Sequence, residues 1–174
     1  MYRKHLFKVS PSVVNNLTRV LEYSVDNYSD SSEGTCTVNG YQTENVINLI
    51  NPDVLSEIKS CSLVHVNNMA EDYAFDDILI DYVHIIKYNV GGYQTLHNHY
   101  ETEDMSFIIH LSDTTSATVF KHYDYEERIT GKVGDMLVFN SCISHYGDVV
   151  KEKKVVAVGS IKIINKKWLD RSIK

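Results

Sequence analysis

Cysteine is scarce in this 174-residue chain, which has three, Cys36, Cys61 and Cys142. Their number is odd, their spacings are wide and no C-x-x-C pair occurs. Neither a disulfide framework nor a structural zinc ribbon is therefore expected. This cysteine usage fits a reducing compartment, and we predict a cytoplasmic protein.

Long hydrophobic runs are also absent. No apolar stretch approaches the roughly 20 residues of a membrane-spanning helix, and no apolar core follows the basic N-terminal residues as it would in a signal peptide. We therefore expect a soluble protein without a membrane partner. Positive charge is in deficit as well, because 17 Lys and Arg residues stand against 23 Asp and Glu residues. The net charge of -6 disfavours nucleic acid as a partner.

What the chain does contain is ordinary for a globular protein: 43% hydrophobic and 23% charged residues. A chain of this length can bury roughly 70% of its unfolded surface around one core. We expect a single domain, residues 1–174, with a helical N-terminal support over 1–75 and a β-rich core over 76–165.

Two segments of the N-terminal half have apolar residues at helical spacing. Ser10-Pro11 offers a cap and a proline at the first helical position, and it predicts a helix over about 11–25. Asn51-Pro52 repeats this pattern and predicts a second helix over about 52–67. Both helices are expected to pack on the outside of a sheet.

From Ile78 onward the apolar period becomes that of a strand. Residues 77–88 are rich in β-branched and aromatic side chains, and Gly91-Gly92 is expected to close this strand. Two helices followed by several short strands predict an α+β fold whose C-terminal part is a sandwich or a barrel. Six further strands are predicted near 93–99, 105–112, 116–122, 126–130, 135–140 and 153–164.

Polar, turn-rich segments predict the loops. Residues 27–35 read as a surface loop. Because binding specificity commonly resides in loops, we expect 27–45 and 66–77 to act as lids over a site.

The triplet His97-Asn98-His99 carries the clearest chemical signal. Successive side chains of a strand point to opposite faces, so His97 and His99 point to the same side. Two neutral imidazoles that converge in this way suit a divalent metal. His145 follows a glycine turn and an apolar run, and we predict that it joins them as metal ligand and catalytic residue. The other histidines have no partner at a useful spacing and are interpreted as structural: His5, His65, His84, His110 and His122.

The stretch Lys87–His99 resembles the start of the double-stranded β-helix of the Fe(II)- and 2-oxoglutarate-dependent dioxygenases, in particular the prolyl-hydroxylase branch. There, a strand with a tyrosine and a glycine turn lead to the first metal histidine. Residues 105–113, 117–120 and 134–145 resemble the family's apolar strand, its Thr-x-Phe strand and its Gly-Asp approach to the last metal histidine. The resemblance covers about residues 78–164 and implies a jelly-roll or cupin-like barrel.

The resemblance assigns roles to single residues. It implies that His97 and His145 are iron ligands. Lys154, nine residues after His145, matches the basic residue that binds the distal carboxylate of 2-oxoglutarate, a role that suits a point charge. Lys153 is the second choice, and this lysine-rich run can equally be a solvated turn. Tyr88 matches a tyrosine that lines the co-substrate pocket, and it can equally be a core aromatic.

One position departs from the family pattern. The family usually has H-x-D, so that two histidines and one carboxylate bind iron and leave positions open for co-substrate and oxygen. Here His99 takes the place of the aspartate. Either His99 is the third ligand, or one of Glu101, Glu103 and Asp104 replaces it. Three neutral ligands make the iron site one unit more positive and change its redox behaviour.

The function that the resemblance implies is that of a 2-oxoglutarate-dependent oxygenase with Fe(II) as cofactor. It would hydroxylate a C–H bond of a peptide or small molecule, and decarboxylate 2-oxoglutarate to succinate. A cupin is the main alternative, because Gly91, His97-x-His99 and Glu103 also fit the first cupin motif. It would be a three-histidine isomerase, small-molecule dioxygenase or binding module. A catalytically degenerate barrel used for interaction is the third. Only the oxygenase is expected to bind 2-oxoglutarate through Lys154.

Overall fold

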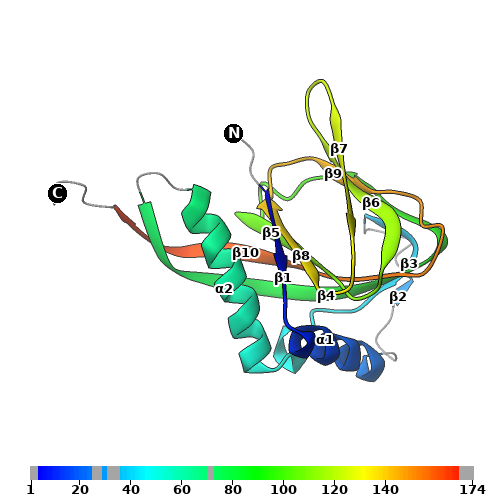
Figure 1. Ribbon diagram of the computed structural model, residues 1–174, viewed down its shortest axis with the longest axis horizontal. Coiled ribbons are helices and arrows are strands. Elements are labelled where there is room, and N and C mark those ends of the chain that lie inside the picture. The colour runs from blue at the N-terminus through cyan, green and yellow to red at the C-terminus, as the bar shows by residue number, and fades with distance from the viewer. Residues whose placement is uncertain (1–3, 25–28, 31–35, 70–72, 169–174) are drawn as a thin grey trace.

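A curled antiparallel sheet and two helices make up the computed structural model, which describes residues 4–24, 29–30, 36–69 and 73–168 (Figure 1). None of the helices in these ranges is long and apolar enough to cross a membrane. The helices are α1 (Pro11–Tyr23) and α2 (Pro52–Met69), with a short 3-10 helix η2 (Ile47–Leu49) between them. The strands are β1 (Lys4–Lys8), β2 (Ser29–Asp30), β3 (Thr37–Gln42), β4 (Tyr73–His97), β5 (Met105–His110), β6 (Thr114–Lys121), β7 (Glu126–Gly131), β8 (Asp135–Asn140), β9 (His145–Gly147) and β10 (Lys154–Trp168).

Strand β4 connects the two halves of the barrel. The strands lie in the order β1-β8-β5-β10-β4-β9-β6-β7, with β3 beside β4 and β2 beside β3. The middle of β4 pairs with β10, where Tyr88 lies opposite Lys154. Its end pairs with β9, where His97 lies opposite His145. The fold is therefore the α+β, jelly-roll-like barrel that the sequence predicts.

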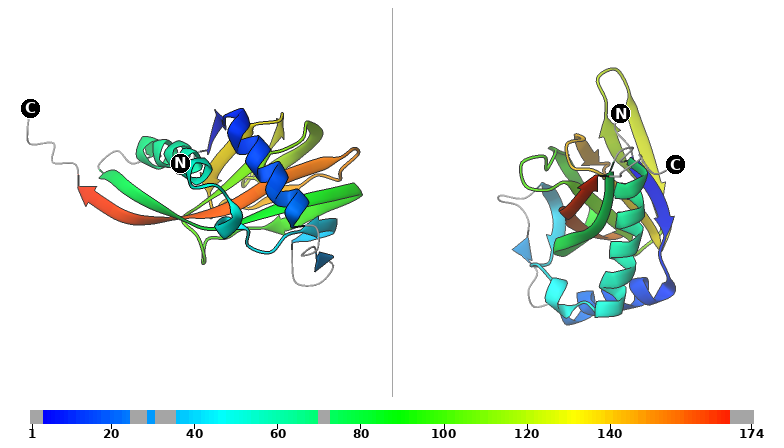
Figure 2. Two further views of the ribbon diagram at one scale, coloured as in Figure 1. Left: turned by 90° about the horizontal axis from the view of Figure 1, so that it is seen from below. Right: turned by 90° about the vertical axis from the view of Figure 1, so that its left-hand side faces the viewer.

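Both helices cover the outer face of the sheet, as predicted (Figure 2). Helix α1 buries Val13, Leu17 and Val20, which the helical period places on one side. This side packs into one core with outward-facing residues of β4 and β10, among them Ile85 and Ala157. Removing the fully buried Leu17 side chain would cost about 2–5 kcal/mol of stability.

Alternate residues of the same strands face the barrel interior instead. On β4, Ile86 follows the outward-facing Ile85, and on β10, Val156 precedes the outward-facing Ala157. Both Ile86 and Val156 belong to a second core with Phe120 and Phe139. This alternation is the period of two expected for a strand with both faces buried. The sequence therefore places Lys154, two residues before Val156, on the interior face.

The predicted helix boundaries are confirmed to within two residues. The prediction that Ser10 caps α1 with its side chain, however, is wrong. The Ser10 side chain makes no capping bond to its own helix. Its backbone N–H and its hydroxyl both donate to the Glu57 carboxylate of α2, each at 2.6 Å. At the start of α2 the Asn51 side chain accepts the Asp53 backbone N–H at 2.8 Å, as a cap should.

The prediction that Gly91-Gly92 closes a strand is wrong, because β4 continues through both glycines to His97. Gly91 has φ +83°, a conformation that other residues rarely adopt. A Cβ on Gly92 would lie 2.4 Å from the Asn39 backbone oxygen. The glycines thus allow β3 to approach β4 closely while the strand runs on.

Several other boundaries differ from the predictions. Strands β1, β3 and β9 were not expected, and residues 29–30 form β2 inside the predicted loop 27–35, of which 27–28 and 31–35 lie outside the described residues. The expected lid 27–45 contains strand β3. In the expected lid 66–77, residues 66–69 end α2 and 73–77 begin β4, whereas 70–72 lie outside the described residues.

Candidate metal centre

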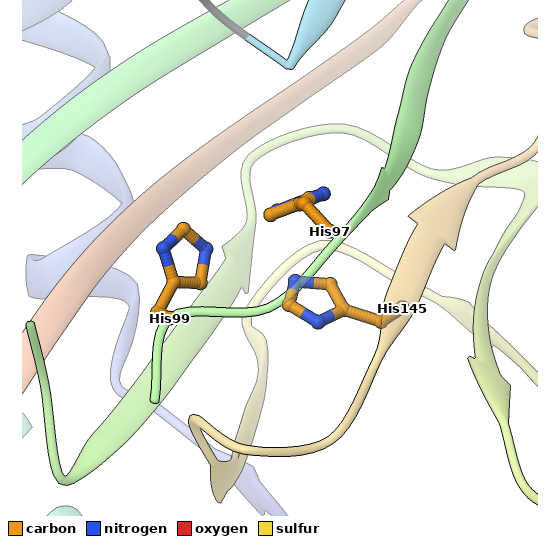
Figure 3. A group of neighbouring side chains, drawn as sticks. All are labelled: His97, His99 and His145. Atoms are coloured by element: carbon orange, nitrogen blue, oxygen red, sulfur yellow. The ribbon is translucent and has the colours of Figure 1, made fainter. Parts of the chain in front are cut away.

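Three histidines meet at the end of the barrel (Figure 3). His97 is the last residue of β4, His99 follows two residues later, and His145 begins β9 opposite His97. The ring centroids lie 4.3 Å apart for His97 and His145, 4.8 Å for His97 and His99, and 5.6 Å for His99 and His145. One nitrogen from each ring lies within 4.8 Å of the other two. The structure thus brings together the three residues that the sequence singles out.

Backbone carbonyls orient two of these rings. His97 Nδ1–H donates to the Thr95 carbonyl at 2.7 Å, and His145 Nδ1–H donates to the Ile143 carbonyl at 2.9 Å. A carbonyl only accepts, so each Nδ1 carries the proton and each Nε2 keeps its lone pair. Such bonds orient histidines that bind metals.

Burial keeps all three imidazoles neutral. It lowers the pKa of His97 and of His99, and it lowers the pKa of His145 to about 3, helped by the nearby His97. Their lone pairs are therefore available at pH 7. Two nitrogens on one metal lie about 3 Å apart for bonds of about 2.1 Å. Side-chain rotations can close the wider separations seen here.

Two of the three alternative carboxylate ligands point elsewhere. Glu101 is exposed, and its carboxylate accepts the Tyr100 hydroxyl at 2.8 Å. The Asp104 carboxylate accepts the Ile163 backbone N–H at 2.8 Å. Both carboxylates thus stabilise local structure.

Glu103, the third alternative, lies behind His99. Its Oε1 is 3.4 Å from His99 Nδ1, so a metal bound by this ring would be held by Nε2. The other carboxylate contacts are hydrogen bonds from the Tyr82 hydroxyl and, at 2.8 Å, from the Ser106 hydroxyl. Burial raises the pKa of Glu103, and these two hydrogen bonds oppose the rise. The arrangement favours His99 over Glu103 as the residue that faces a metal.

A cavity of about 240 Å³ adjoins the three histidines. Cys36, directly before β3, and Gln42, the last residue of β3, border it, so part of the segment expected as a lid does lie at the site. The rest of the cavity wall includes both polar and apolar side chains, among them Tyr82, His84, Gln94, Ile86, Ile108 and Phe139. Ligand pockets usually measure about 300–1,000 Å³. The space suits a small molecule or a single inserted group.

Lys154 is buried on the interior face of β10, and Lys153 is exposed. Its ammonium donates to the Ser116 carbonyl at 3.3 Å and lies 5.5 Å from the centre of the Tyr88 ring. Burial lowers the pKa of Lys154 to about 8. No ion pair among the described residues includes Lys154. A buried cation without a carboxylate is costly, and it is a ready site for an anion.

Lys154 and Tyr88 do not line the cavity; they lie one layer below it. Ile86, which does line the cavity, precedes Tyr88 by two residues on β4, a rise of about 7 Å. Val156 lies opposite Ile86, and Lys154 lies opposite Tyr88. The Lys154 side chain is long and flexible, so its ammonium can move within this layer below the cavity.

His110 joins this lower layer, although the sequence left it as structural. It lies on β5 opposite Val156, is buried, and its Nδ1 has no hydrogen-bond partner among the described residues. The nearby Lys154 charge and burial lower its pKa to about 4, with burial the larger cause. The ring packs on Gly131, where a Cβ would lie 2.1 Å away. The alternation of Ser106, Ile108 and His110 on β5 was the signal for this position.

The remaining histidines have separate roles. His84 lines the cavity and its Nδ1 donates to the Thr43 carbonyl at 2.9 Å. His5 and His65 bond to each other through their Nδ1 atoms at 2.6 Å, where β1 meets α2. His122 stacks on Tyr125 at 4.3 Å.

A double-stranded β-helix with three histidines clustered at one end is the class of structure that these features define. No protein-family model matches the chain, and no curated protein matches its sequence. Its structure is similar to a Pseudomonas putida prolyl-4-hydroxylase, with a TM-score of 0.67 and 11% identity over 94% of this chain and 93% of that one.

Two other solved structures show the same similarity. HygX from Streptomyces hygroscopicus, with nickel and 2-oxoglutarate bound, has a TM-score of 0.67 at 9% identity, over 92% of this chain and 82% of that one. The non-heme α-ketoglutarate-dependent epimerase SnoN of nogalamycin biosynthesis has a TM-score of 0.68 at 6% identity, over 98% of this chain and 80% of that one. At such identities the likeness shows a shared fold, and the predicted double-stranded β-helix is confirmed.

Proposed function

We propose that this protein is an Fe(II)- and 2-oxoglutarate-dependent oxygenase whose iron is held by His97, His99 and His145. The observation that carries the proposal is the convergence of three neutral imidazoles at one end of the barrel. Imidazole nitrogens suit Fe(II). Three ligands on one side of the metal leave its other coordination positions for a co-substrate and O2.

Lys154 and His110 are the proposed partners of the distal carboxylate of 2-oxoglutarate. Within the part of the chain that the structure describes, Lys154 is a buried cation without a carboxylate partner, and His110 has a buried ring nitrogen without a hydrogen-bond partner. Both can donate to a carboxylate, which would offset the cost of burying the ammonium. Tyr88 holds the lysine from the side through its ring. The 2-oxoglutarate bound to HygX supports the assignment by analogy of fold.

Fe(II) held by His97, His99 and His145 would supply the oxidising power together with 2-oxoglutarate and O2, and 2-oxoglutarate would leave as succinate and CO2. The side chains of the chain itself bind and orient the reactants and exclude water. Ile86, Ile108 and Phe139 make the cavity wall apolar beside the histidines, which favours entry of a C–H-bearing group. We propose that the group belongs to a peptide or a small molecule and that it is hydroxylated. SnoN has a similar fold and is an epimerase, so the fold alone does not determine the reaction. The reaction of this protein therefore has to be identified by experiment.

The test is succinate formation by the iron-loaded protein from 2-oxoglutarate and O2, first without a substrate. We expect slow turnover that needs iron and that the double variant His97→Ala/His145→Ala lacks. Metal binding without any 2-oxoglutarate binding would contradict the oxygenase and favour the three-histidine cupin. If neither ligand binds, the barrel used for interaction is favoured instead.

A further inference from the structure

Among the three histidines, only His99 forms an ion-pair contact within 4 Å with a carboxylate of the described residues, although the charge of Glu103 also acts on His97. The Nδ1–H groups of His97 and His145 meet neutral carbonyls, whereas Nδ1 of His99 faces Glu103 Oε1 at 3.4 Å. A carboxylate behind a ligand imidazole fixes the ring and raises its basicity. The negative charge that an aspartate ligand would bring to the metal is therefore carried by Glu103, which lies behind the His99 ring.

Glu103 is built into this position. Its side chain is 2% exposed. The Tyr82 hydroxyl donates to Oε1, the oxygen that also faces His99, and the Ser106 hydroxyl donates to Oε2. His99 is its single ion-pair partner among the described residues, so no lysine or arginine compensates the buried charge. Burying an uncompensated carboxylate is costly. A dication on the other side of the His99 ring would compensate it.

We propose that Glu103 is a positioning residue that acts through His99: it orients the imidazole and supplies the negative charge that a direct carboxylate ligand would otherwise give the metal. This inference rests on the proposed metal site. It differs from the alternative in which Glu103 itself binds the metal, because the carboxylate lies on the Nδ1 side of the ring. Tyr82 and Ser106 hold the carboxylate in place.

The experiment is a calorimetric titration of the chain with Co(II), without 2-oxoglutarate. Glu103→Gln keeps the size of the side chain and removes its charge, and we expect a roughly 10–100-fold loss of affinity. The control Glu101→Gln removes the same charge from an exposed side chain two residues earlier, and we expect no change in Co(II) affinity. An affinity equal to wild type in Glu103→Gln would overturn the inference. Absence of Co(II) binding by the wild-type chain would instead overturn the proposed metal site.

A second background separates positioning from a merely structural role. In His99→Asp no imidazole remains between Glu103 and the metal, and two carboxylates face each other. Adding Glu103→Gln to His99→Asp is therefore expected to leave Co(II) affinity unchanged or to raise it. A loss as large as in the wild-type background would mean that Glu103 acts on the fold and not through His99.

Two further readouts complete the test. The Fe(III)/Fe(II) potential should rise in Glu103→Gln, because an anion near the iron favours Fe(III). An unchanged potential would contradict the charge role. If Glu103→Gln does not fold, Ser106→Ala removes one hydrogen bond that holds the carboxylate, and we expect a several-fold loss of Co(II) affinity. An unchanged affinity in this folded variant would overturn the inference.

Discussion

His99 determines the charge of the proposed metal centre, because it provides a neutral ligand where the dioxygenase family usually has an aspartate. We expect His99→Ala to lower Fe(II) affinity at least about 100-fold, since it removes one of three ligands. His99→Asp should keep the metal, because Fe(II) accepts carboxylate and imidazole alike. Anaerobic titration with Fe(II) measures both, with exposed Asn98→Ala as a matched neighbour. No loss in His99→Ala would remove His99 from the site.

Lys154 is the residue on which co-substrate binding depends. Its ammonium is buried and forms no ion pair with a described residue. We therefore expect Lys154→Met to weaken 2-oxoglutarate binding by about 2 kcal/mol, or roughly 30-fold, with metal affinity retained. Lys153→Met, on the exposed face of the same strand, serves as control. Calorimetry with the metal-loaded protein under nitrogen measures the difference. If Lys153→Met causes the loss and Lys154→Met does not, the lysine assignment is wrong.

The same lysine also makes stability depend on pH. Burial lowers its pKa from 10.5 to about 8, so between these values the unfolded chain binds more protons than the folded one. The free energy of unfolding should therefore rise from pH 8 towards pH 10.5 in the ligand-free protein. Lys154→Met should flatten this rise and stabilise the protein at pH 7 by about 1–3 kcal/mol. Urea unfolding at pH 7 and pH 9.5 measures both effects, and a destabilised Lys154→Met variant would contradict them.

Among the elements, helix α1 depends on α2 for its N-terminus. Glu57 of α2 accepts both the backbone N–H and the hydroxyl of Ser10, so the cap comes from another helix. We expect Glu57→Ala to lower the free energy of unfolding by about 1–2 kcal/mol. Glu22→Ala, which removes the same charge from an exposed position of α1, should change it by less than about 0.5 kcal/mol. Equal effects of the two substitutions would show that the contact does not stabilise α1.

Strand β4 shows what a local pattern can and cannot predict. The alternation of its residues correctly assigns the strand and its two faces. Glycine is typical of turns, so Gly91-Gly92 predicts an end, yet these glycines provide space for Asn39 of β3. Strands β1 and β3 were not predicted, because their hydrogen bonds are made to β8 and β4, which lie far away along the chain. Pairing over such separations has no local signature.

For the whole molecule, the order of motifs along the chain was sufficient to predict the barrel. The convergence of His97, His99 and His145 was predicted from a strand over 93–99 and a matching later strand. The three side chains do converge, but β4 ends at His97, so His99 lies just beyond the strand. The direction of the Glu103 carboxylate was not predictable, because it depends on the loop before β5 and on a hydrogen bond from Tyr82 of β4, 21 residues earlier in the chain. The place of His110 beside Lys154 was not predicted either, because the two residues lie on different strands, β5 and β10.

The central claim is that one divalent metal binds at the three histidines, and iron analysis tests it most directly. Wild-type chain and the double variant His97→Ala/His145→Ala are loaded with Fe(II) under nitrogen, desalted and analysed for iron, with circular dichroism to confirm that the variant is folded. We predict about one iron per chain for the wild type, and none for the variant, because a single imidazole remains. Stoichiometric iron in the folded double variant would contradict the account.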